Sequence, residues 1–569
     1  MYSNLENVKI LVSLLKAYNI RHIVLSPGNR NVPLVCAVEN DPFFKCYLIV
    51  DERSAGFVAV GLIEELKQPV AICCTSGTAM CNYTSSVAEA YYQHLPLVVL
   101  TANRNPYYLN QAEDQTIPQA ELLKSITKYA TQLPVVKDDK DYWYCWNQVN
   151  TALLEINHHG KGPVHIDFAV EKGLEKYDEI EKGDMPKLSP IKRHCLEDSM
   201  KSWSEKVNEL KSAKKILVLY GQNAPVGEAQ KKRIEEFAGK YNCVIATEHI
   251  SNMHCRGSVD TCLVSSTLTR EQYSTVMPDL VISFEGNFVS NMKNILKANS
   301  GQYKHWLVSE SGNVEDPFRC LSDIFECSAD YFFRFFAKNA GDIVSDRNYF
   351  NIWNDLVSRR STENIQFSDL YAVRSLMNGI PENSILHIAN SSSIRIANIF
   401  PLKDSVTVYC NRGTNGIDGS MSSFIGHSMV TDRTCFLLIG DLSFFYDMNG
   451  LWNNYVGKNV RILLNNNSGA ELFHYAYGDS IGYISSEHSS TAKGWVTSRG
   501  FRYLSASNRK EFDENMKIFL SEDSDAPIFF EVYTSKQENA KALHDFYDAN
   551  KDISMKVLAK RAIKNIIKK

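Results

Sequence analysis

Two short apolar runs near the C-terminal end of the chain each stop at polar residues, and this arrangement constrains the fold most. The run Thr434–Ile439 ends in Gly440-Asp441, and the run Val460–Leu464 ends in Asn465-Asn466-Asn467. Apolar runs of this length are typical of buried strands in a parallel sheet. Open α/β sheets bind ligands at the carboxyl ends of their strands. We therefore predict that Asp441 and Asn466 meet at one edge of a parallel sheet.

The residues around these two strand ends have the chemistry of a site for a metal and a diphosphate. The Asp441 carboxylate, the Asn466 amide oxygen and the Ser468 carbonyl are oxygen donors of the kind that Mg²⁺ prefers. The segment Phe444–Tyr455 is predicted to be a helix, whose N-terminus offers free N–H groups to a diphosphate. Taken alone, Gly-Asp and Asn-Asn-Asn are also common turn residues after strands, so that alternative stays open here.

An acidic pair near the N-terminus is the second chemical feature. The strand-like run Tyr47–Val50 leads into Asp51-Glu52 at the start of a predicted helix. Burial of a carboxyl group at this position would raise its pKa and favour a shared proton over a free charge. Glu52 is our candidate for that group. The alternative is that both acids only stabilise the helix N-terminus.

The Gly440-Asp441…Asn465-Asn466 pattern resembles the diphosphate-and-metal signature of thiamine diphosphate (ThDP) enzymes. Further segments resemble the MenD family, 2-succinyl-5-enolpyruvyl-6-hydroxy-3-cyclohexene-1-carboxylate synthase of menaquinone biosynthesis, in order along nearly the whole chain. They are Ser26–Arg30, Asp51–Gly56, Cys74–Ala79 and Asn411–Gly419. The last of these, Asn-Arg-Gly…Gly-Ile-Asp-Gly, is specific to that family among ThDP enzymes.

The resemblance implies a ThDP-dependent transferase, a carboligase, that uses Mg²⁺ or Mn²⁺. It implies decarboxylation of 2-oxoglutarate and conjugate addition of the resulting enamine to isochorismate. ThDP confines the chemistry to bonds next to a carbonyl carbon. The resemblance also implies that Glu52 and Asp441 meet from different subunits, so that the active sites lie at the interface of a homodimer or homotetramer.

The resemblance assigns site residues one by one, with arginines for the substrate carboxylates because the planar guanidinium binds carboxylates in pairs. The candidates for catalysis are Glu52, Arg30, Gln115, Arg395 and Arg412. Those for cofactor binding are Glu52, Ser76, Gly77, Thr78, Asn390, Ser391, Ile417, Gly440, Asp441, Leu442, Ser443, Asn466, Leu472 and Phe473. Those for substrate binding are Asn29, Arg30, Arg104, Gln115, Lys293, Ser391, Arg395 and Arg412. Those for the metal are Asp441, Asn466 and Ser468. Any single arginine could instead be a surface residue paired with an acid.

The chain departs from the family pattern near the expected substrate contacts. The departures are Asn29, Asn31, Asn103, Asn415 and the pair Ser468-Gly469 where the family has Gly-Gly. An added Asn brings both a donor and an acceptor. A MenD-like paralogue that joins another 2-oxo acid or another acceptor is therefore an alternative, and a simple ThDP-dependent 2-oxo acid decarboxylase is another. A cofactor-free scaffold is disfavoured because Glu52 and Asp441 are intact.

Composition argues against other classes of protein. The net charge of −4 over 569 residues gives no electrostatic case for binding nucleic acid. Fourteen cysteines without a Cys-x-x-Cys pair argue against a zinc cluster and fit a reducing cytoplasm. We find no signal peptide and no apolar run near the ~18 residues of a membrane helix. The basic segment Lys551–Lys569 could contact an anionic membrane as an amphipathic helix, but we favour a helix docked on the last domain.

Alternating strand and helix patterns predict an α/β protein with three doubly wound parallel-sheet domains of the ThDP-enzyme type. We expect a pyrimidine-binding domain at 1–180, a central α/β domain without a dinucleotide motif at 195–340, and a diphosphate- and Mg-binding domain with the basic C-terminal helix at 350–569. In the first domain we expect a helix at Asn7–Tyr18 and strands at His22–Leu25, Cys46–Val50, Val70–Cys74 and Leu95–Thr101. The expected linkers are Lys176–Lys192 and Ala337–Asn348.

Overall fold

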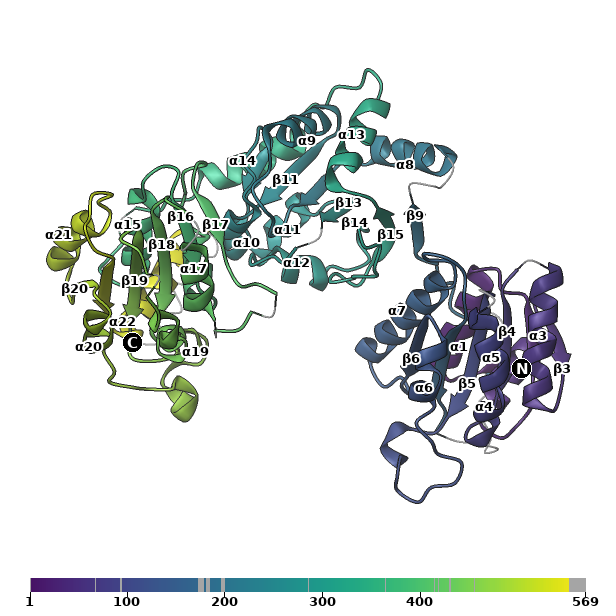
Figure 1. The fold of residues 1–569 in the computed structure, drawn as a ribbon. Coiled ribbons are helices and arrows are strands. Elements are labelled where there is room, and N and C mark those ends of the chain that lie inside the picture. The colour runs from purple at the N-terminus through teal and green to yellow at the C-terminus, as the bar shows by residue number, and fades with distance from the viewer. Residues whose placement is uncertain are drawn as a thin grey trace, which may run out of the picture. The chain divides into compact units, whose positions relative to one another are not determined.

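The structure is a computed structural model of the chain (Figure 1). It describes residues 2–66, 68–92, 95–171, 179–180, 185–195, 200–284, 286–363, 365–413, 415–417, 419–428, 431–454 and 456–551. Thr414, Asp418, Tyr455 and the tail 552–569, which the sequence analysis used, lie outside the described residues. The chain divides into two compact units, Met1–Arg193 and His194–Lys569. The predicted α/β class is confirmed, because the described residues form one six-stranded, one seven-stranded and another six-stranded α/β sheet.

The first unit contains a six-stranded sheet in the order β3-β2-β4-β5-β7-β6, and every pairing in it is parallel. Its strands are β2 (His22–Leu25), β3 (Lys45–Leu48), β4 (Val70–Cys74), β5 (Leu97–Asn103), β6 (Tyr129–Leu133) and β7 (Val164–Ala169). Its helices are α1 (Glu6–Ala17), α2 (Val32–Glu39), α3 (Glu52–Leu66), α4 (Thr78–Asn82), α5 (Thr84–Tyr92), α6 (Gln119–Leu122) and α7 (Asp139–Glu155), with 3₁₀ turns at Pro106–Tyr108 and Lys124–Ile126. A two-stranded antiparallel ribbon joins β1 (Tyr2–Ser3) to β8 (Glu179–Ile180).

The predicted elements of this unit fall within a few residues of the observed ones. The strands His22–Leu25 and Val70–Cys74 are confirmed at both ends. β5 starts at Leu97, two residues later than predicted, because Pro96 has no N–H to give to the ladder. Successive strand residues face opposite helix layers, as a sheet covered on both faces requires. Ile23, Ala71 and Val98 pack with α1, α2 and α7, whereas the next residue of each strand packs with α3 and α5.

The second unit begins with a seven-stranded sheet in the order β12-β11-β10-β13-β14-β15-β9, parallel from β12 to β15. Its strands are β9 (Lys192–Cys195), β10 (Ile216–Leu219), β11 (Cys243–Thr247), β12 (Ser258–Asp260), β13 (Leu280–Phe284), β14 (Lys304–Ser309) and β15 (Leu321–Glu326). Its helices are α8 (Met200–Ser212), α9 (Glu228–Lys240), α10 (Cys262–Thr267), α11 (Arg270–Val276), α12 (Met292–Ala298), α13 (Ala329–Asn339) and α14 (Asn348–Ser358), with a 3₁₀ turn at His249–Ser251. The predicted linker Ala337–Asn348 therefore shrinks to the eight residues between α13 and α14.

The second unit also contains a parallel six-stranded sheet in the order β17-β16-β18-β19-β21-β20. Its strands are β16 (Ile385–Ile388), β17 (Thr407–Tyr409), β18 (Cys435–Gly440), β19 (Val460–Asn466), β20 (Arg502–Ala506) and β21 (Ile528–Tyr533). Its helices are α15 (Asp369–Gly379), α16 (Ser392–Ala397), α17 (Ser420–Ser428), α18 (Asp441–Tyr446), α19 (Glu471–Tyr477), α20 (Lys493–Ser498), α21 (Arg509–Phe519) and α22 (Lys536–Ala549), with 3₁₀ turns at Met448–Leu451 and Gly478–Ser485.

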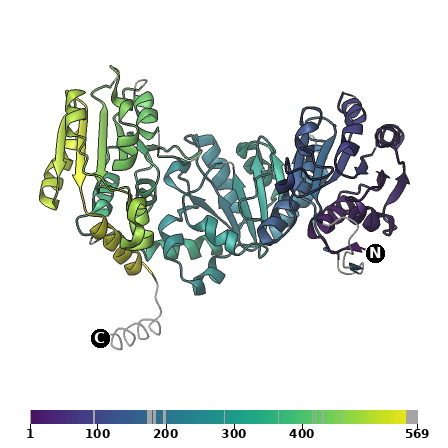
Figure 2. The same cartoon turned by 90° about the horizontal axis from the view of Figure 1, so that it is seen from below.

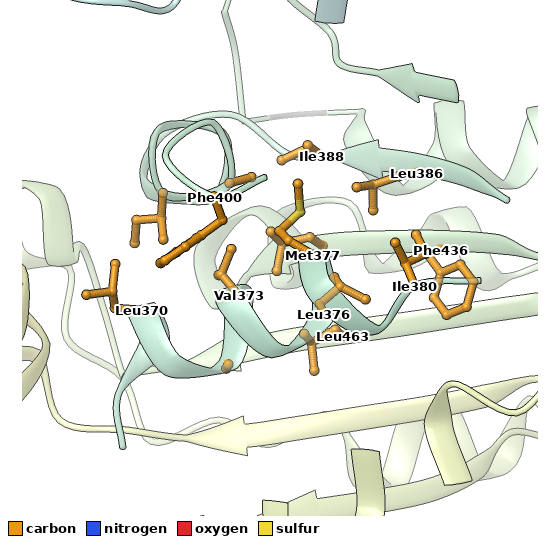
Figure 3. Close-up of a cluster of buried hydrophobic side chains, with 14 of the residues drawn as sticks. Leu370, Val373, Leu376, Met377, Ile380, Leu386, Ile388, Phe400, Phe436 and Leu463 are labelled. Atoms are coloured by element: carbon orange, nitrogen blue, oxygen red, sulfur yellow. The ribbon is translucent and has the colours of Figure 1, made fainter. Parts of the chain in front are cut away.

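Helices cover both faces of this C-terminal sheet (Figure 2). On one face, side chains of α15 such as Leu376 and Met377 pack against Leu386, Phe436 and Leu463 of the strands (Figure 3). On the other face, the alternating strand residues pack against α17 and α20. No helix among the described residues is both long and apolar enough to cross a membrane.

The helix predicted at Phe444–Tyr455 is wrong in its start and its length. The helix α18 begins at Asp441 and ends at Tyr446, and a separate 3₁₀ turn covers Met448–Leu451. Asp447 lies between these elements and the 3₁₀ turn contains Asn449 and Gly450, residue types that favour turns over a continued helix. The helix therefore starts directly after β18, three residues earlier than predicted, and Asp441 is its first residue.

Strand order fixes where each outer sheet can bind a ligand. In the first sheet the direction of the crossovers reverses between β2 and β4, and in the C-terminal sheet it reverses between β16 and β18. Open α/β sheets form a crevice at this point, at the carboxyl ends of the strands. Gly28 lies in the first crevice, where a Cβ atom would stand 2.4 Å from the Cβ of Thr75. Only glycine fits this close approach.

Candidate active site

The crevice of the C-terminal sheet holds a cavity of about 270 Å³. It is lined by residues that follow β16, β18 and β19, among them Ser391, Asp441 and Gly469. Asp441 is buried at the start of α18. Its carboxylate accepts hydrogen bonds from the N–H groups of Leu442 (2.7 Å), Asn467 (3.1 Å) and Gly469 (3.0 Å). Burial raises the pKa of the Asp441 carboxyl, although these N–H groups and the nearby His488 oppose the shift.

The three asparagines at the end of β19 face different surroundings. Asn465 and Asn467 line the cavity, and the side-chain oxygen of each is buried without a hydrogen-bond partner. Asn466 alternates to the other side, where its amide nitrogen donates to Glu531 on β21 (2.7 Å) and to the Ser490 carbonyl (3.0 Å). A buried polar atom left unpaired costs about 1–3 kcal/mol. The two unpaired oxygens therefore favour a bound ligand or cation in this cavity.

A buried ammonium group contacts the predicted metal loop. Ser468 has a left-handed backbone (φ 64°), and its carbonyl oxygen accepts a hydrogen bond from Lys536 Nζ at 3.2 Å. The same ammonium lies 2.9 Å from Glu487 Oε1, and the Lys536 side chain is only 7% exposed. A cation already contacts the carbonyl that we predicted as a metal ligand. Sequence reasoning missed Lys536, because it lies 68 positions further along the chain.

Two further buried acids line the same cavity. Asn467 donates to Asp369 Oδ2 at 3.0 Å and to Glu471 Oε2 at 2.8 Å. Burial, followed by the charge of the neighbouring Asp369, raises the pKa of Glu471 well above its ordinary value. The charge of Asp369 therefore disfavours ionisation of the Glu471 carboxyl. Neither acid was predicted, since no motif marks a pair that is brought together from α15 and α19.

The loop that follows β17 carries Arg412 and is held by the loops of the central sheet. Asn390 Oδ1 accepts from Arg412 Nη1 at 2.9 Å, and Asn390 Nδ2 donates to the Asn411 and Gly416 carbonyls, each at 2.7 Å. Asn287 donates to the Arg412 carbonyl (2.7 Å) and Gln222 to the Cys410 carbonyl (2.8 Å). Burial lowers the pKa of Arg412, and its Nε has no partner among the described residues.

A second cavity, of about 280 Å³, adjoins the first and shares Ser392, Ile396 and Leu472 with it. Arg395 on α16 lines this second cavity together with Tyr547 and Lys551. The other predicted cofactor residues of this unit line the first cavity: Asn390, Ser391, Ile417, Gly440, Leu442, Ser443, Leu472 and Phe473. Lys293 lies apart from both, in a cavity of about 190 Å³ at the end of β13.

The first unit gathers its predicted residues around the crevice between β2 and β4. Glu52 is the first residue of α3, and its carboxylate accepts a hydrogen bond from Asn82 at 3.0 Å. Gly77 has φ 81° and lies close to Gln115. A Cβ atom on Gly77 would stand only 3.1 Å from the Gln115 Cα. Ser76 is buried, and its hydroxyl has no partner among the described residues. Thr78 starts α4 and is exposed.

Two of the arginines predicted for this unit differ in their environment. Arg30 is 7% exposed, and its Nη1 donates to the Glu171 carbonyl at 3.3 Å. Arg104 is paired with Glu113 at 2.9 Å, and its Nε donates to the Asp114 carbonyl at 2.8 Å. Arg104 therefore already has the acidic partner that the alternative interpretation of a lone arginine required.

The structure separates the unusual asparagines into two groups. Asn31 is fully buried and holds its own loop, since it accepts from the Gly28 N–H (2.8 Å) and donates to the Ser26 carbonyl (2.9 Å). Asn103 is buried and donates to Asp167 at 2.9 Å. Asn29 and Asn415 are exposed, and Asn415 has φ 61°, which Asn tolerates better than most residues. Asn31 and Asn103 therefore serve the fold, whereas Asn29 and Asn415 are accessible at the surface.

A buried network behind the first crevice was missed by sequence reasoning. Gln119 accepts from the Gly77 N–H at 2.7 Å and donates to Asp167 at 2.7 Å. Asp167 is fully buried and also accepts from Thr101 and Gln132. Burial raises its pKa, although these hydrogen bonds oppose the shift. The network ties the Ser76–Thr78 turn to the centre of the sheet.

Comparisons with known proteins agree with this arrangement. Residues 6–122 match the family model "Thiamine pyrophosphate enzyme, N-terminal TPP binding domain". The chain is 38% identical over 562 residues to the 2-succinyl-5-enolpyruvyl-6-hydroxy-3-cyclohexene-1-carboxylate synthase of Bacteroides fragilis, and the match covers 96% of this chain and 99% of that protein. The synthases of Bacteroides thetaiotaomicron and Christiangramia forsetii are 37% and 33% identical over the same shares of both chains.

The three parallel α/β sheets and the matched domain define a thiamine diphosphate-dependent enzyme. Carboxylates and unpaired amide oxygens line the cavity at Asp441, and these are oxygen donors of the kind that Mg²⁺ prefers. Within this class, the chain belongs to the family of 2-succinyl-5-enolpyruvyl-6-hydroxy-3-cyclohexene-1-carboxylate synthases of menaquinone biosynthesis. The family resemblance found in the sequence motifs is confirmed.

Proposed function

We propose that the enzyme joins 2-oxoglutarate to isochorismate with loss of CO₂, using ThDP and Mg²⁺ at the cavity that Asp441 lines. The observation that carries the proposal is the convergence of buried carboxylates and unpaired amide oxygens at the β16–β18 crevice. When bound, ThDP would supply a nucleophilic carbon and an electron sink for loss of CO₂ from a 2-oxo acid.

The metal would be held beside the cavity by Asp441, which lines it, and by the side-chain oxygen of Asn466 and the Ser468 carbonyl, which lie on the adjoining loop, with Mn²⁺ as a substitute for Mg²⁺. All three are hard oxygen donors, and Mg²⁺ completes its octahedron with phosphate oxygens and water. The loop from Asn466 to Gly469 folds around Asp441, as the hydrogen bonds of Asn467 and Gly469 to its carboxylate indicate. Ser391, Ile417, Leu442 and Ser443 would contact the cofactor from the remaining sides of the cavity.

The substrate carboxylates would meet the arginines of both units. Arg395 lines the cavity beside the cofactor cavity, and Arg412 has a buried Nε that still lacks an acceptor. A carboxylate is a strong partner for such donors because both groups are charged. Arg30, Arg104, Gln115 and Asn29 would contribute from the first unit. We propose a weaker role for Lys293, since it lines a separate cavity.

Glu52 would hold a proton at the aminopyrimidine ring of ThDP, with Ser76, Gly77 and Thr78 beside that ring. We propose three domains with the boundaries 1–180, 195–340 and 350–569, in which the first supplies Glu52 and the last supplies Asp441. The free state of the thirteen cysteines whose side chains are described supports a cytoplasmic location.

We propose that the two halves of each site come from two copies of the chain, in a homodimer or homotetramer. The support is a set of large apolar side chains, each more than 40% exposed, in the segments that follow β18 and β19: Tyr446, Trp452, Phe473, Tyr477 and Ile484. Aromatic residues are enriched at protein–protein interfaces.

The deciding experiment incubates the purified protein with ThDP, Mg²⁺, 2-oxoglutarate and isochorismate, and detects the succinylated adduct by mass spectrometry. An adduct that requires both substrates supports the proposal. Release of CO₂ from 2-oxoglutarate without an adduct would replace it with a paralogue that uses another acceptor, or with a simple decarboxylase. No reaction with ThDP bound would replace the 2-oxo acid as well.

A further inference from the structure

Glu531 on β21 is a fully buried carboxylate in contact with the proposed metal loop. It is 0% exposed, and its Oε1 accepts a hydrogen bond from Asn466 Nδ2 at 2.7 Å. The carboxylate is held in turn by the Ala492 N–H (3.2 Å), the Thr491 hydroxyl (3.1 Å) and the Tyr503 hydroxyl (2.8 Å). These last three donors lie outside the loop Asn466–Gly469, so they hold the carboxylate without help from the metal loop.

This contact decides which end of the Asn466 amide faces the loop. The two ends of an asparagine side chain have nearly the same shape, but only the oxygen can bind a cation. Both partners of Asn466 Nδ2, the Glu531 carboxylate and the Ser490 carbonyl, are acceptors. Rotation of the amide would place its oxygen against both acceptors. Asn466 Oδ1 therefore stays on the loop side, where it is 3.3 Å from the Ser468 N–H.

We infer that Glu531 is a positioning residue that holds the oxygen of Asn466 ready for the metal. This inference rests on the proposed role of Asn466 as a metal ligand. Glu531 contacts neither metal nor substrate in this proposal, and it acts only through the orientation of the amide. A residue that orients a ligand in this way typically changes metal affinity by about 10- to 100-fold when it is removed.

The test first removes the donor of the hydrogen bond between Asn466 and Glu531, and then exchanges donor and acceptor. Asn466→Asp keeps an oxygen ligand, and a carboxylate is a good ligand for Mg²⁺, so ligand chemistry alone predicts unchanged or tighter binding. If Glu531 positions this side chain, the new carboxylate faces another carboxylate, and Mn²⁺ affinity should fall at least about tenfold. Adding Glu531→Gln should restore the affinity, because the glutamine amide can donate to the new carboxylate.

Two controls complete the design. Glu531→Gln alone should bind Mn²⁺ within about threefold of the unchanged protein, since its oxygen can still accept from Asn466 and Ala492. Tyr503→Phe removes one hydrogen bond of Glu531 without touching Asn466, and it should have as small an effect. The free Mn²⁺ is measured by electron paramagnetic resonance at saturating ThDP, and thermal melting confirms that each variant is folded.

The outcomes separate the inference from the proposed function. Weak binding by Asn466→Asp and recovery in the double variant support the positioning role. Tight binding by Asn466→Asp, or a double variant no better than Asn466→Asp, overturns it while leaving the metal site intact. If the unchanged protein binds no Mn²⁺ in the presence of ThDP, the proposed metal site fails, and the inference fails with it.

Discussion

Replacement of Glu248 by glutamine should change how the stability of this enzyme depends on pH. Glu248 follows β11 and is 2% exposed. Its carboxyl oxygens accept from the N–H groups of Val289 (3.0 and 2.8 Å) and Ser290 (2.6 Å). Burial raises the pKa of Glu248 to about 7 from an ordinary value of 4.5, although these N–H groups oppose the shift.

Proton binding by Glu248 decides whether the stability of the protein rises or falls with pH. Between pH 4.5 and pH 7 the folded protein binds this proton and the unfolded chain releases it, so the stability contributed by Glu248 is lost as the pH rises. Each unit of pKa corresponds to 1.36 kcal/mol, which makes the loss between pH 5 and pH 8 about 2 to 3 kcal/mol. Glutamine is neutral throughout, and its carbonyl oxygen can accept from the same N–H groups.

The assay compares the melting temperatures of the unchanged protein and Glu248→Gln at pH 5 and pH 8. If the unit His194–Lys569 unfolds as a whole, about 2.1 cal/mol/K per residue converts the change into about 3 °C. When the pH is raised from 5 to 8, the melting temperature of Glu248→Gln should therefore rise by about 3 °C relative to that of the unchanged protein. Glu236→Gln, at an exposed position of α9, should show no such gain. If the melting temperatures of Glu248→Gln and the unchanged protein differ by the same amount at pH 5 and pH 8, the reasoning is refuted.

Three further results test the site. Glu52→Gln should lower kcat by about 10²- to 10⁴-fold in steady-state assays while ThDP still quenches the protein fluorescence; full activity would remove Glu52 as the proton-holding residue. Glu52→Gln and Asp441→Ala, each inactive alone, should regain about a quarter of the normal activity when unfolded and refolded together, because half the dimers are then mixed and hold one intact site. Failure to complement would place both residues of a site in one subunit. Arg395→Met should raise KM for one of the two substrates by about 10- to 100-fold without changing Mn²⁺ binding, and unchanged KM values would contradict its proposed contact with a carboxylate.

The sequence alone determined the class of fold and the position of Asp441 at a cavity. Runs such as Val70–Cys74 and Val460–Leu464 are strands whose two faces are both buried. Such strands are apolar throughout, so they can be recognised from the sequence. Asp441 lies at the cavity because it follows such a strand next to the point where the strand order reverses. The length of α18 could not be predicted, because the turn-forming residues after Tyr446 also occur inside helices when tertiary contacts favour it.

Only the tertiary structure decided which polar groups meet inside the fold. It pairs Glu531 with Asn466, Asp369 with Glu471 through Asn467, and Lys536 with the Ser468 carbonyl. It also places Asn31 and Asn103 in structural hydrogen bonds, so two of the departures that raised doubt about the substrate serve the fold. Apart from Asn467–Glu471 and Asn31–Ser26, these contacts join residues at least 64 positions apart in the chain. They depend on strand register and side-chain rotamers. A linear motif carries neither, because a buried hydrogen bond is specified jointly by both partners and by the packing that holds them.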